Sequence, residues 1–129
     1  MAVSFRISTT IPAPPERIFA AWLDSNAHSA MTGAGASVSP NPGEVFQAWD
    51  GYIQGRNLEL EPGRRIVQAW RTVEFADDEP DSRLEITFQA VPDGTLVTIF
   101  HSELPPNGMQ YEQGWEESYF DPMLVYFEG

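Results

Sequence analysis

Odd-numbered positions at the start of the chain are hydrophobic or β-branched, and the positions between them are mostly polar. Val3, Phe5, Ile7 and Ile11 belong to this set, and they share one face if the segment is extended. The prolines at positions 12, 14 and 15 cannot continue such a strand. The pattern therefore predicts a strand over residues 3–11.

The spacing then changes to a helical one. Residues 18, 19, 22 and 23 are hydrophobic and fall on one helical face, and Pro15 suits the first turn of a helix. We expect this helix to end near Asp24. Asp24 or Ser25 can cap a second short helix that runs through Met31, and Gly33 is placed to end it.

From residue 36 onward, short hydrophobic runs are separated by turn residues. The turns are expected at residues 41–43, 50–51, 61–63, 77–82 and 92–94. This spacing predicts an antiparallel meander of about six strands. Within it, hydrophobic and polar positions alternate, so one face of the sheet should be buried and the other hydrated. The residues predicted to face inward are Ile66, Gln68 and Trp70, then Leu84, Ile86, Phe88 and Ala90, and then Val97, Ile99 and His101.

The twenty residues 108–127 predict an amphipathic helix with an aromatic stripe. Its inward positions are Tyr111, Trp115, Tyr119, Met123 and Tyr126. Pro122 interrupts this pattern because a proline within a helix lacks a hydrogen-bond donor. We expect a kink there, or a restart with Asp121 as the cap. A strand, two short helices, a strand meander and a long terminal helix define an α+β fold.

Composition narrows the possible functions. The chain has 129 residues, 42% of them hydrophobic, which suits one domain over residues 1–129. Its net charge of −12 argues against a nucleic-acid partner. It contains no lysine and no cysteine, which excludes a Schiff-base lysine, a thiolate nucleophile and thiolate metal ligands. We therefore expect no cofactor and no metal site.

The sequence predicts a soluble, cytoplasmic protein without a membrane partner. The longest uninterrupted hydrophobic run covers residues 18–23, whereas a membrane-spanning helix needs about 20 residues. The N-terminal segment also lacks the basic and apolar regions of a secretory signal. The sequence leaves the oligomeric state open.

Several segments together resemble a known family. They are APPERIFAAW at 13–22, GEVF at 43–46, Gly55, LELEP at 58–62, RIV at 65–67, Trp70-Arg71, GTLVTIFH at 94–101 and Gly114-Trp115. In this order and spacing they resemble the activator of Hsp90 ATPase homologue family (C-terminal-domain type), within the START-like, birch-pollen-allergen-like superfamily (SRPBCC).

The resemblance implies a helix-grip fold, with a cavity between a curved sheet and the terminal helix. Members of this superfamily stimulate a chaperone ATPase, bind lipids, hormones or polyketides, or catalyse cyclisation or hydrolysis. The sequence has no counterpart of the separate N-terminal domain with which the eukaryotic co-chaperones first engage their partner. The resemblance therefore supports the family's fold for this chain better than it supports the chaperone role.

Seven residues on predicted inward faces are candidates for lining such a cavity. Converging aromatic side chains can form the apolar wall of a ligand pocket, and they can equally fill a core that has no pocket. Gln68 is a candidate polar anchor, as is Arg56, although a shift of one residue along a strand would invert its face. The seven candidates are Trp22, Phe46, Gln68, Trp70, Phe88, His101 and Trp115.

His101 allows two interpretations. It can orient a ligand or act as an acid or base in the cavity, or it can be a structural histidine with satisfied hydrogen bonds. His28 lies in the polar second helix and is predicted to be exposed. The four acidic residues around Pro80, within segment 77–81, are predicted to form a solvated loop, and no nucleophile motif is present.

Three functions remain open. The first is a START-like domain, not an enzyme, that binds a small apolar or aromatic ligand between sheet and terminal helix. The second is a chaperone-regulating or other protein-interaction module whose acidic surface docks a basic protein partner. The third is a cyclase or hydrolase that uses His101 as its acid or base; no other catalytic residue is predicted.

Overall fold

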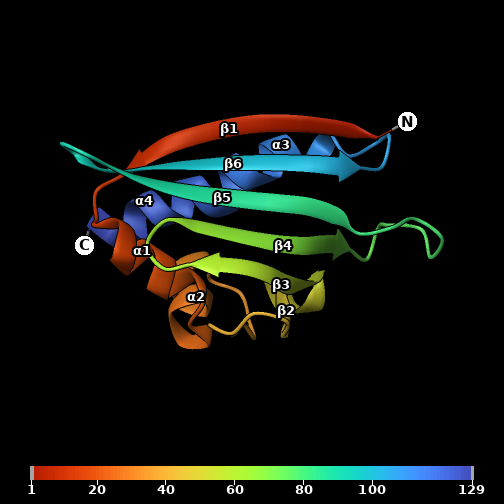
Figure 1. The fold of residues 1–129 in the computed structure, drawn as a ribbon, viewed down its shortest axis with the longest axis horizontal. Coiled ribbons are helices and arrows are strands. Elements are labelled where there is room, and N and C mark those ends of the chain that lie inside the picture. Colours follow the sequence, from red (N-terminus) through yellow and green to blue (C-terminus); the bar gives the residue numbers. More distant parts are fainter. Residues whose placement is uncertain (1, 129) are drawn as a thin grey trace.

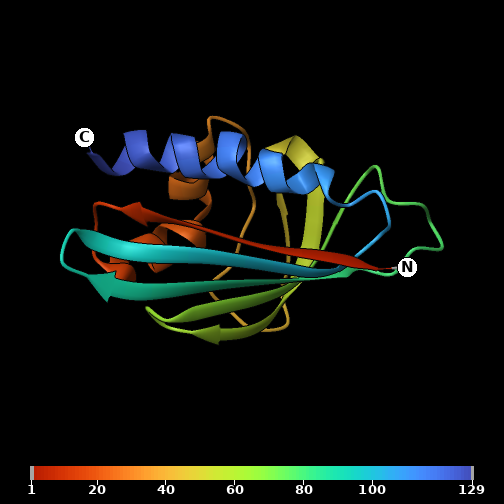
Figure 2. The same ribbon diagram turned by 90° about the horizontal axis from the view of Figure 1, so that it is seen from above.

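A computed structural model describes residues 2–128. One antiparallel sheet carries all the helices on a single face (Figures 1 and 2). The predicted strand over 3–11, the two short helices and the strand meander are all present. In chain order the elements are β1 (Val3–Ile11), α1 (Pro15–Trp22), α2 (Ser25–Thr32), β2 (Val45–Ala48), η1 (Trp49–Gly51), β3 (Ile53–Glu61), β4 (Arg65–Thr72), β5 (Ser82–Val91), β6 (Gly94–Leu104), α3 (Gln110–Trp115), η2 (Glu116–Phe120) and α4 (Asp121–Glu128).

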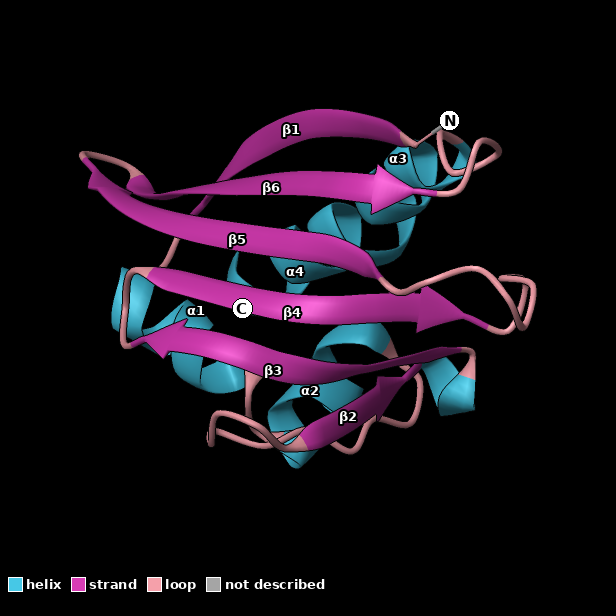
Figure 3. Ribbon diagram, turned by 45° about the vertical axis from the view of Figure 1, so that its right-hand side comes forward, coloured by secondary structure: helices cyan, strands magenta, loops and turns pink. Residues whose placement is uncertain are grey.

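The sheet has six strands in the order β1-β6-β5-β4-β3-β2. Every neighbouring pair is antiparallel. Strands β2 to β6 follow one another as a meander. The last of them, β6, pairs with β1, the first strand of the chain, which forms one edge of the sheet (Figure 3). The meander therefore supplies five of the strands, and the first strand of the chain supplies the sixth.

Local sequence signals set the ends of the short helices. The Asp24 side chain caps α2 by accepting a hydrogen bond from the Ala27 backbone N–H at 2.8 Å. Gly33 ends the same helix with φ at 82°, a left-handed conformation that glycine adopts without steric cost. Both boundaries agree with the sequence-based expectation.

The terminal helix crosses the sheet as one rod made of α3, η2 and α4 (Figure 2). The expected restart at Asp121 is wrong, because Asp121 has helical dihedral angles. Its backbone N–H donates to the Glu116 carbonyl, five residues back, so η2 is a turn of π-helix. This wider turn lets the helix pass through Pro122 without a break.

The π turn also explains which side chains the helix buries. Its buried stripe recurs every four residues, and each such step over-rotates a regular α-helix by about 40°. The extra residue of a π turn takes back about 100°, so the stripe stays on the sheet. Phe127 is buried in place of the predicted Tyr126, which is only partly covered. The stripe is Tyr111, Trp115, Tyr119, Met123 and Phe127.

The hydrophobic core fills the space between the concave face of the sheet and the helices. The predicted inward residues of β4, β5 and β6 are buried there, with the exception of Ala90, which is exposed at the hairpin end of β5. Ile66, Leu84, Ile86 and Ile99 are fully buried. Within residues 2–128, no helix has the length and hydropathy needed to cross a bilayer.

Candidate functional site

A cleft of about 240 Å³ opens between one end of the sheet and the terminal helix. Strands β3 and β4 form one wall, α3 and η2 form the other, and η1 lies at its side. Its lining residues are largely aromatic. They are Trp49, Tyr52, Ile53, Trp70, Tyr111, Gly114, Trp115, Ser118 and Tyr119.

Two backbone features leave the cleft open. Gly114 faces it from α3, and a Cβ atom added there would meet no described atom within 4 Å apart from its chain neighbours and the adjacent helix backbone. On the other side, Trp49 and Asp50 have φ values of 52° and 57°, a left-handed conformation that is costly for residues other than glycine. The Asp50 carboxylate holds this bend by accepting a hydrogen bond from the Gly35 backbone N–H at 2.8 Å.

The aromatic walls of the cleft support one another. Trp70 meets Tyr111 edge to face at a ring-centroid distance of 5.1 Å, and it lies 5.7 Å from Trp115. Trp115 in turn lies 4.8 Å from Tyr119. Trp22 stacks on Tyr119 from behind at 4.8 Å. These contacts fix the orientations of the Trp70, Tyr111, Trp115 and Tyr119 rings, because each of the four packs against at least one other ring.

The polar groups at the cleft are mostly paired. The Tyr111 hydroxyl hydrogen-bonds the Thr72 hydroxyl at 2.6 Å, and the Tyr52 hydroxyl donates to the Glu74 carboxylate. Burial raises the pKa values of Tyr52, Tyr111 and Tyr119, so these phenols stay protonated near neutral pH. The indole nitrogen of Trp49 is the one buried side-chain polar atom within residues 2–128 that has no hydrogen-bond partner.

His101 lies behind the wall of the cleft, and both of its ring nitrogens are engaged. The Ser82 hydroxyl donates to the Trp70 carbonyl at 2.8 Å, so His101 Nε2 must carry the proton that joins it to Ser82 Oγ at 2.8 Å. The indole N–H of Trp115 donates to His101 Nδ1 at 3.0 Å. Burial lowers the pKa of His101 to about 3, and the imidazole is therefore neutral.

The seven predicted residues separate into different environments. Trp70 and Trp115 line the cleft, and Trp22 and His101 support them from behind. Gln68 is buried and donates to Asn57 Oδ1 at 2.9 Å, while Asn57 holds the loop before β2 through the Ser39 and Asn41 carbonyls. Away from the cleft, Phe88 packs edge to face on Phe19, and Phe46 packs under Gly55.

Sequence reasoning missed most of the lining residues. Tyr111 and Tyr119 were visible as members of the Trp115 stripe, and that shared face was the signal that could have placed them at the site. Trp49 and Tyr52 gave no such signal, because they flank a turn whose backbone conformation decides where they point.

The expectation that His28 is exposed is wrong, because only 2% of its surface is accessible. Its Nδ1 donates to the Trp22 carbonyl at 2.8 Å, and its Nε2 accepts from the Tyr119 hydroxyl at 2.9 Å. Burial lowers its pKa. Helix α2 packs beneath the terminal helix, so even this polar helix has one buried side.

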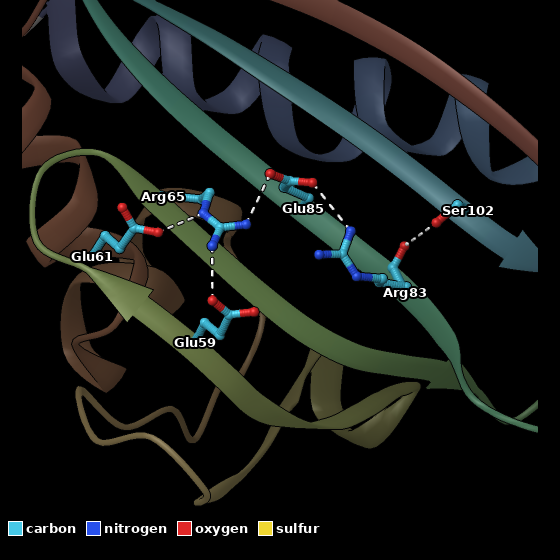
Figure 4. Close-up of polar contacts among 6 residues, drawn as sticks. All are labelled: Glu59, Glu61, Arg65, Arg83, Glu85 and Ser102. Atoms are coloured by element: carbon cyan, nitrogen blue, oxygen red, sulfur yellow. Dashed lines mark hydrogen bonds and ion pairs between the residues drawn. The ribbon is translucent and has the colours of Figure 1, made fainter.

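Charged residues form a network on the opposite face of the sheet (Figure 4). Arg65 pairs with Glu59, Glu61 and Glu85 at 2.8, 2.7 and 3.1 Å, and Arg83 also pairs with Glu85 at 3.1 Å. Within the part of the chain that the structure describes, no arginine lines the cleft. The described residues contain no group of three side chains that could hold a metal ion.

A six-stranded antiparallel sheet that grips a long terminal helix, with a small aromatic cleft between them, defines a START-like protein of the helix-grip class. The chain belongs to the family described as "Activator of Hsp90 ATPase homolog 1-like protein", whose model matches residues 12–128.

One relative is the activator of 90 kDa heat shock protein ATPase homolog of Dictyostelium discoideum, which is 27% identical over 122 residues. That match covers 92% of this chain and 31% of the relative, and the chain spans about a third of the length of the curated relatives it matches.

Two solved structures show the same fold. An Hsp90 activator from Plasmodium falciparum superposes with a TM-score of 0.86 at 23% identity, covering 95% of this chain and 94% of the other. CalU16 from Micromonospora echinospora superposes with a TM-score of 0.78 at 26% identity, covering 98% and 76%.

Proposed function

We propose that this protein binds a small apolar or aromatic molecule in the cleft between β3, β4 and the terminal helix. The observation that carries the proposal is the open space in front of Gly114, walled by six aromatic side chains. Aromatic and apolar walls with a few polar groups are typical of small-molecule sites. An engineered cavity of about 150 Å³ holds benzene, so a cleft of about 240 Å³ has room for a single ring with a substituent.

An acid–base role for His101 has less support. Its two nitrogens are already occupied by Ser82 and Trp115, and the ring is buried. A protonated imidazole would place an N–H against the indole N–H of Trp115. We therefore propose binding and not cyclisation or hydrolysis as the role of the cleft.

Titration with a panel of neutral single-ring compounds, followed by tryptophan fluorescence, tests the proposal. Three of the four tryptophans line the cleft, so occupancy should change the emission. Saturable binding to the wild type and its loss in Gly114→Leu are the expected results. The matched control is Gln113→Leu, which adds the same side chain at the neighbouring exposed position and should bind as the wild type does. Absence of saturable binding across the panel, or equal binding to Gly114→Leu, would refute the proposal.

A second candidate function is contact with an Hsp90-type chaperone. The family and the name of the Dictyostelium relative favour it, and the net charge of −12 suits a basic partner surface. The test measures the ATPase rate of a purified Hsp90 with and without this protein at low and high salt. Stimulation that weakens with salt supports the candidate, whereas an unchanged ATPase rate at low salt argues against it.

A further inference from the structure

We propose that the small apolar or aromatic ligand of the cleft carries an alkylated ammonium group, which is held against the aromatic walls. This inference rests on the proposed function and specifies the chemistry of the ligand. It follows from the ring content of the walls, from the charge at the rim and from the positions of the arginines.

The walls have the composition of a cation-binding cage. Three indole and three phenol rings surround a space of about 240 Å³. The negative face of an aromatic ring attracts a cation, most strongly for tryptophan and where water is excluded. The rings stand at different angles to one another, with Trp70 at 79° to Tyr111 and 40° to Trp115. They therefore enclose a rounded space instead of a flat slot, which suits a compact ammonium group.

A carboxylate lies at the rim. Glu74 is exposed and accepts the hydrogen bond of the Tyr52 hydroxyl. Its backbone N–H donates to the Thr72 hydroxyl, which hydrogen-bonds Tyr111, and its charge contributes to the raised pKa of Tyr111. Glu74 thus places a negative charge beside two lining residues, where it favours a cationic ligand.

Among residues 2–128, no positively charged side chain lines the cleft. His101, behind the wall, is neutral because burial lowers its pKa to about 3. Arg71 lies on the wall strand β4, and its guanidinium lies over Phe75, outside the lining. There it pairs with Asp81 at 2.9 Å and donates to two backbone carbonyls. The electrostatic field at the cleft is therefore set by Glu74 and the protein's net negative charge.

The test compares choline with 3,3-dimethylbutan-1-ol, which has the same shape but a carbon atom in place of the charged nitrogen. Binding is followed by tryptophan fluorescence at low ionic strength. We expect choline to bind at least tenfold more tightly, which is ~1.4 kcal/mol and within the range of cation–π contacts. Glu74→Gln should weaken choline binding roughly threefold, a size typical of charge pairs at an exposed rim. It should leave the alcohol unaffected.

Asp78→Asn is the matched control, because it removes one negative charge from an exposed residue of the loop after β4 and should change neither affinity. Equal binding of choline and the alcohol, or equal weakening of both by Glu74→Gln, overturns the cation inference and leaves the proposed function standing. Binding of the neutral single-ring panel without binding of choline has the same meaning. Failure of every compound overturns both proposals.

Discussion

Gly114 offers the sharpest test of the cleft because its missing side chain is what keeps the space open. Apart from its chain neighbours and the adjacent helix backbone, a Cβ atom at this position would meet no described atom within 4 Å, and the residue lies inside α3 without a positive φ. A glycine within a helix costs about 1 kcal/mol relative to alanine. Gly114→Ala should therefore raise the free energy of unfolding by about 1 kcal/mol, which in a chain of this size raises Tm by roughly 3–6 °C.

Gly114→Leu separates stability from binding. Leucine has nearly the helix propensity of alanine, and its larger side chain should extend into the cleft that Gly114, Trp70 and Trp115 line. The variant should be at least as stable as the wild type, yet it should bind cleft ligands at least tenfold more weakly because its side chain occupies their volume. A change that stabilises the fold and removes its ligand binding points to a site, since ordinary core positions lose stability when they are overpacked.

Urea unfolding followed by tryptophan fluorescence measures the stability of both variants, and the same signal measures ligand titration. Gln113→Ala, at the adjacent exposed position, controls for general changes in the helix. The reasoning is refuted if Gly114→Ala destabilises the protein, because the space in front of it would then be occupied. It is also refuted if Gly114→Leu is stable and still binds with wild-type affinity.

Three further changes test the surroundings of the cleft. Because the folded-state pKa of His101 is lowered to about 3, only the unfolded chain takes up this proton between pH 6.5 and 3. Urea unfolding between pH 7 and 5 should therefore show stability decreasing as the pH decreases, with a slope from this group that approaches about 1.4 kcal/mol per unit below pH 6.5. His101→Gln should flatten that slope by one proton. Trp115→Phe leaves His101 Nδ1 without its donor and should cost about 1–3 kcal/mol in urea unfolding; unchanged stability would contradict the assigned tautomer. Gly55→Ala would bring a Cβ atom to 2.0 Å from the Ala69 carbonyl oxygen and should lower the free energy of unfolding by at least ~2 kcal/mol; a wild-type Tm in a thermal melt would contradict the close packing of β3 on β4.

Periodicity was sufficient to predict most of the fold. Strict alternation placed Ile66, Leu84 and Val97 on the inner face, because a strand that is half buried has only one register that hides its hydrophobic side chains. The caps of α2 were equally readable, since Asp24 and Gly33 act on the backbone next to them. These signals are local, and the physical effect lies within a few residues of its cause.

The site was less predictable because its geometry depends on contacts between distant segments. His101 and Gln68 were correctly placed on inward faces, but their partners Ser82, Trp115 and Asn57 come from other elements. Nothing in the residues themselves says that Ser82 and Trp115 occupy both ring nitrogens of His101, or that Gln68 donates to Asn57. Whether an inward aromatic residue fills the core or lines a cleft depends on what faces it across the sheet.

His28 and Trp49 illustrate the same difficulty. A helix as polar as α2 has no periodic signal for a buried side, so the contact of His28 with Tyr119, 91 positions along the chain, could not be foreseen. The direction of Trp49 depends on a left-handed backbone, which is uncommon for a tryptophan and has no sequence signature of its own.

Because of the π turn at Glu116–Phe120, the exact number of residues in this helix decides which later side chains face the sheet. Removal of one residue such as Glu117 would restore a regular α-helix, but it would also turn every later side chain by about 100° about the axis. Met123 and Phe127, both buried, would then swing away from the sheet, whereas the same deletion in a surface loop would cost little. A one-residue gap between this helix and that of a relative would therefore mark a change of helical phase, with a different set of side chains presented to the cleft.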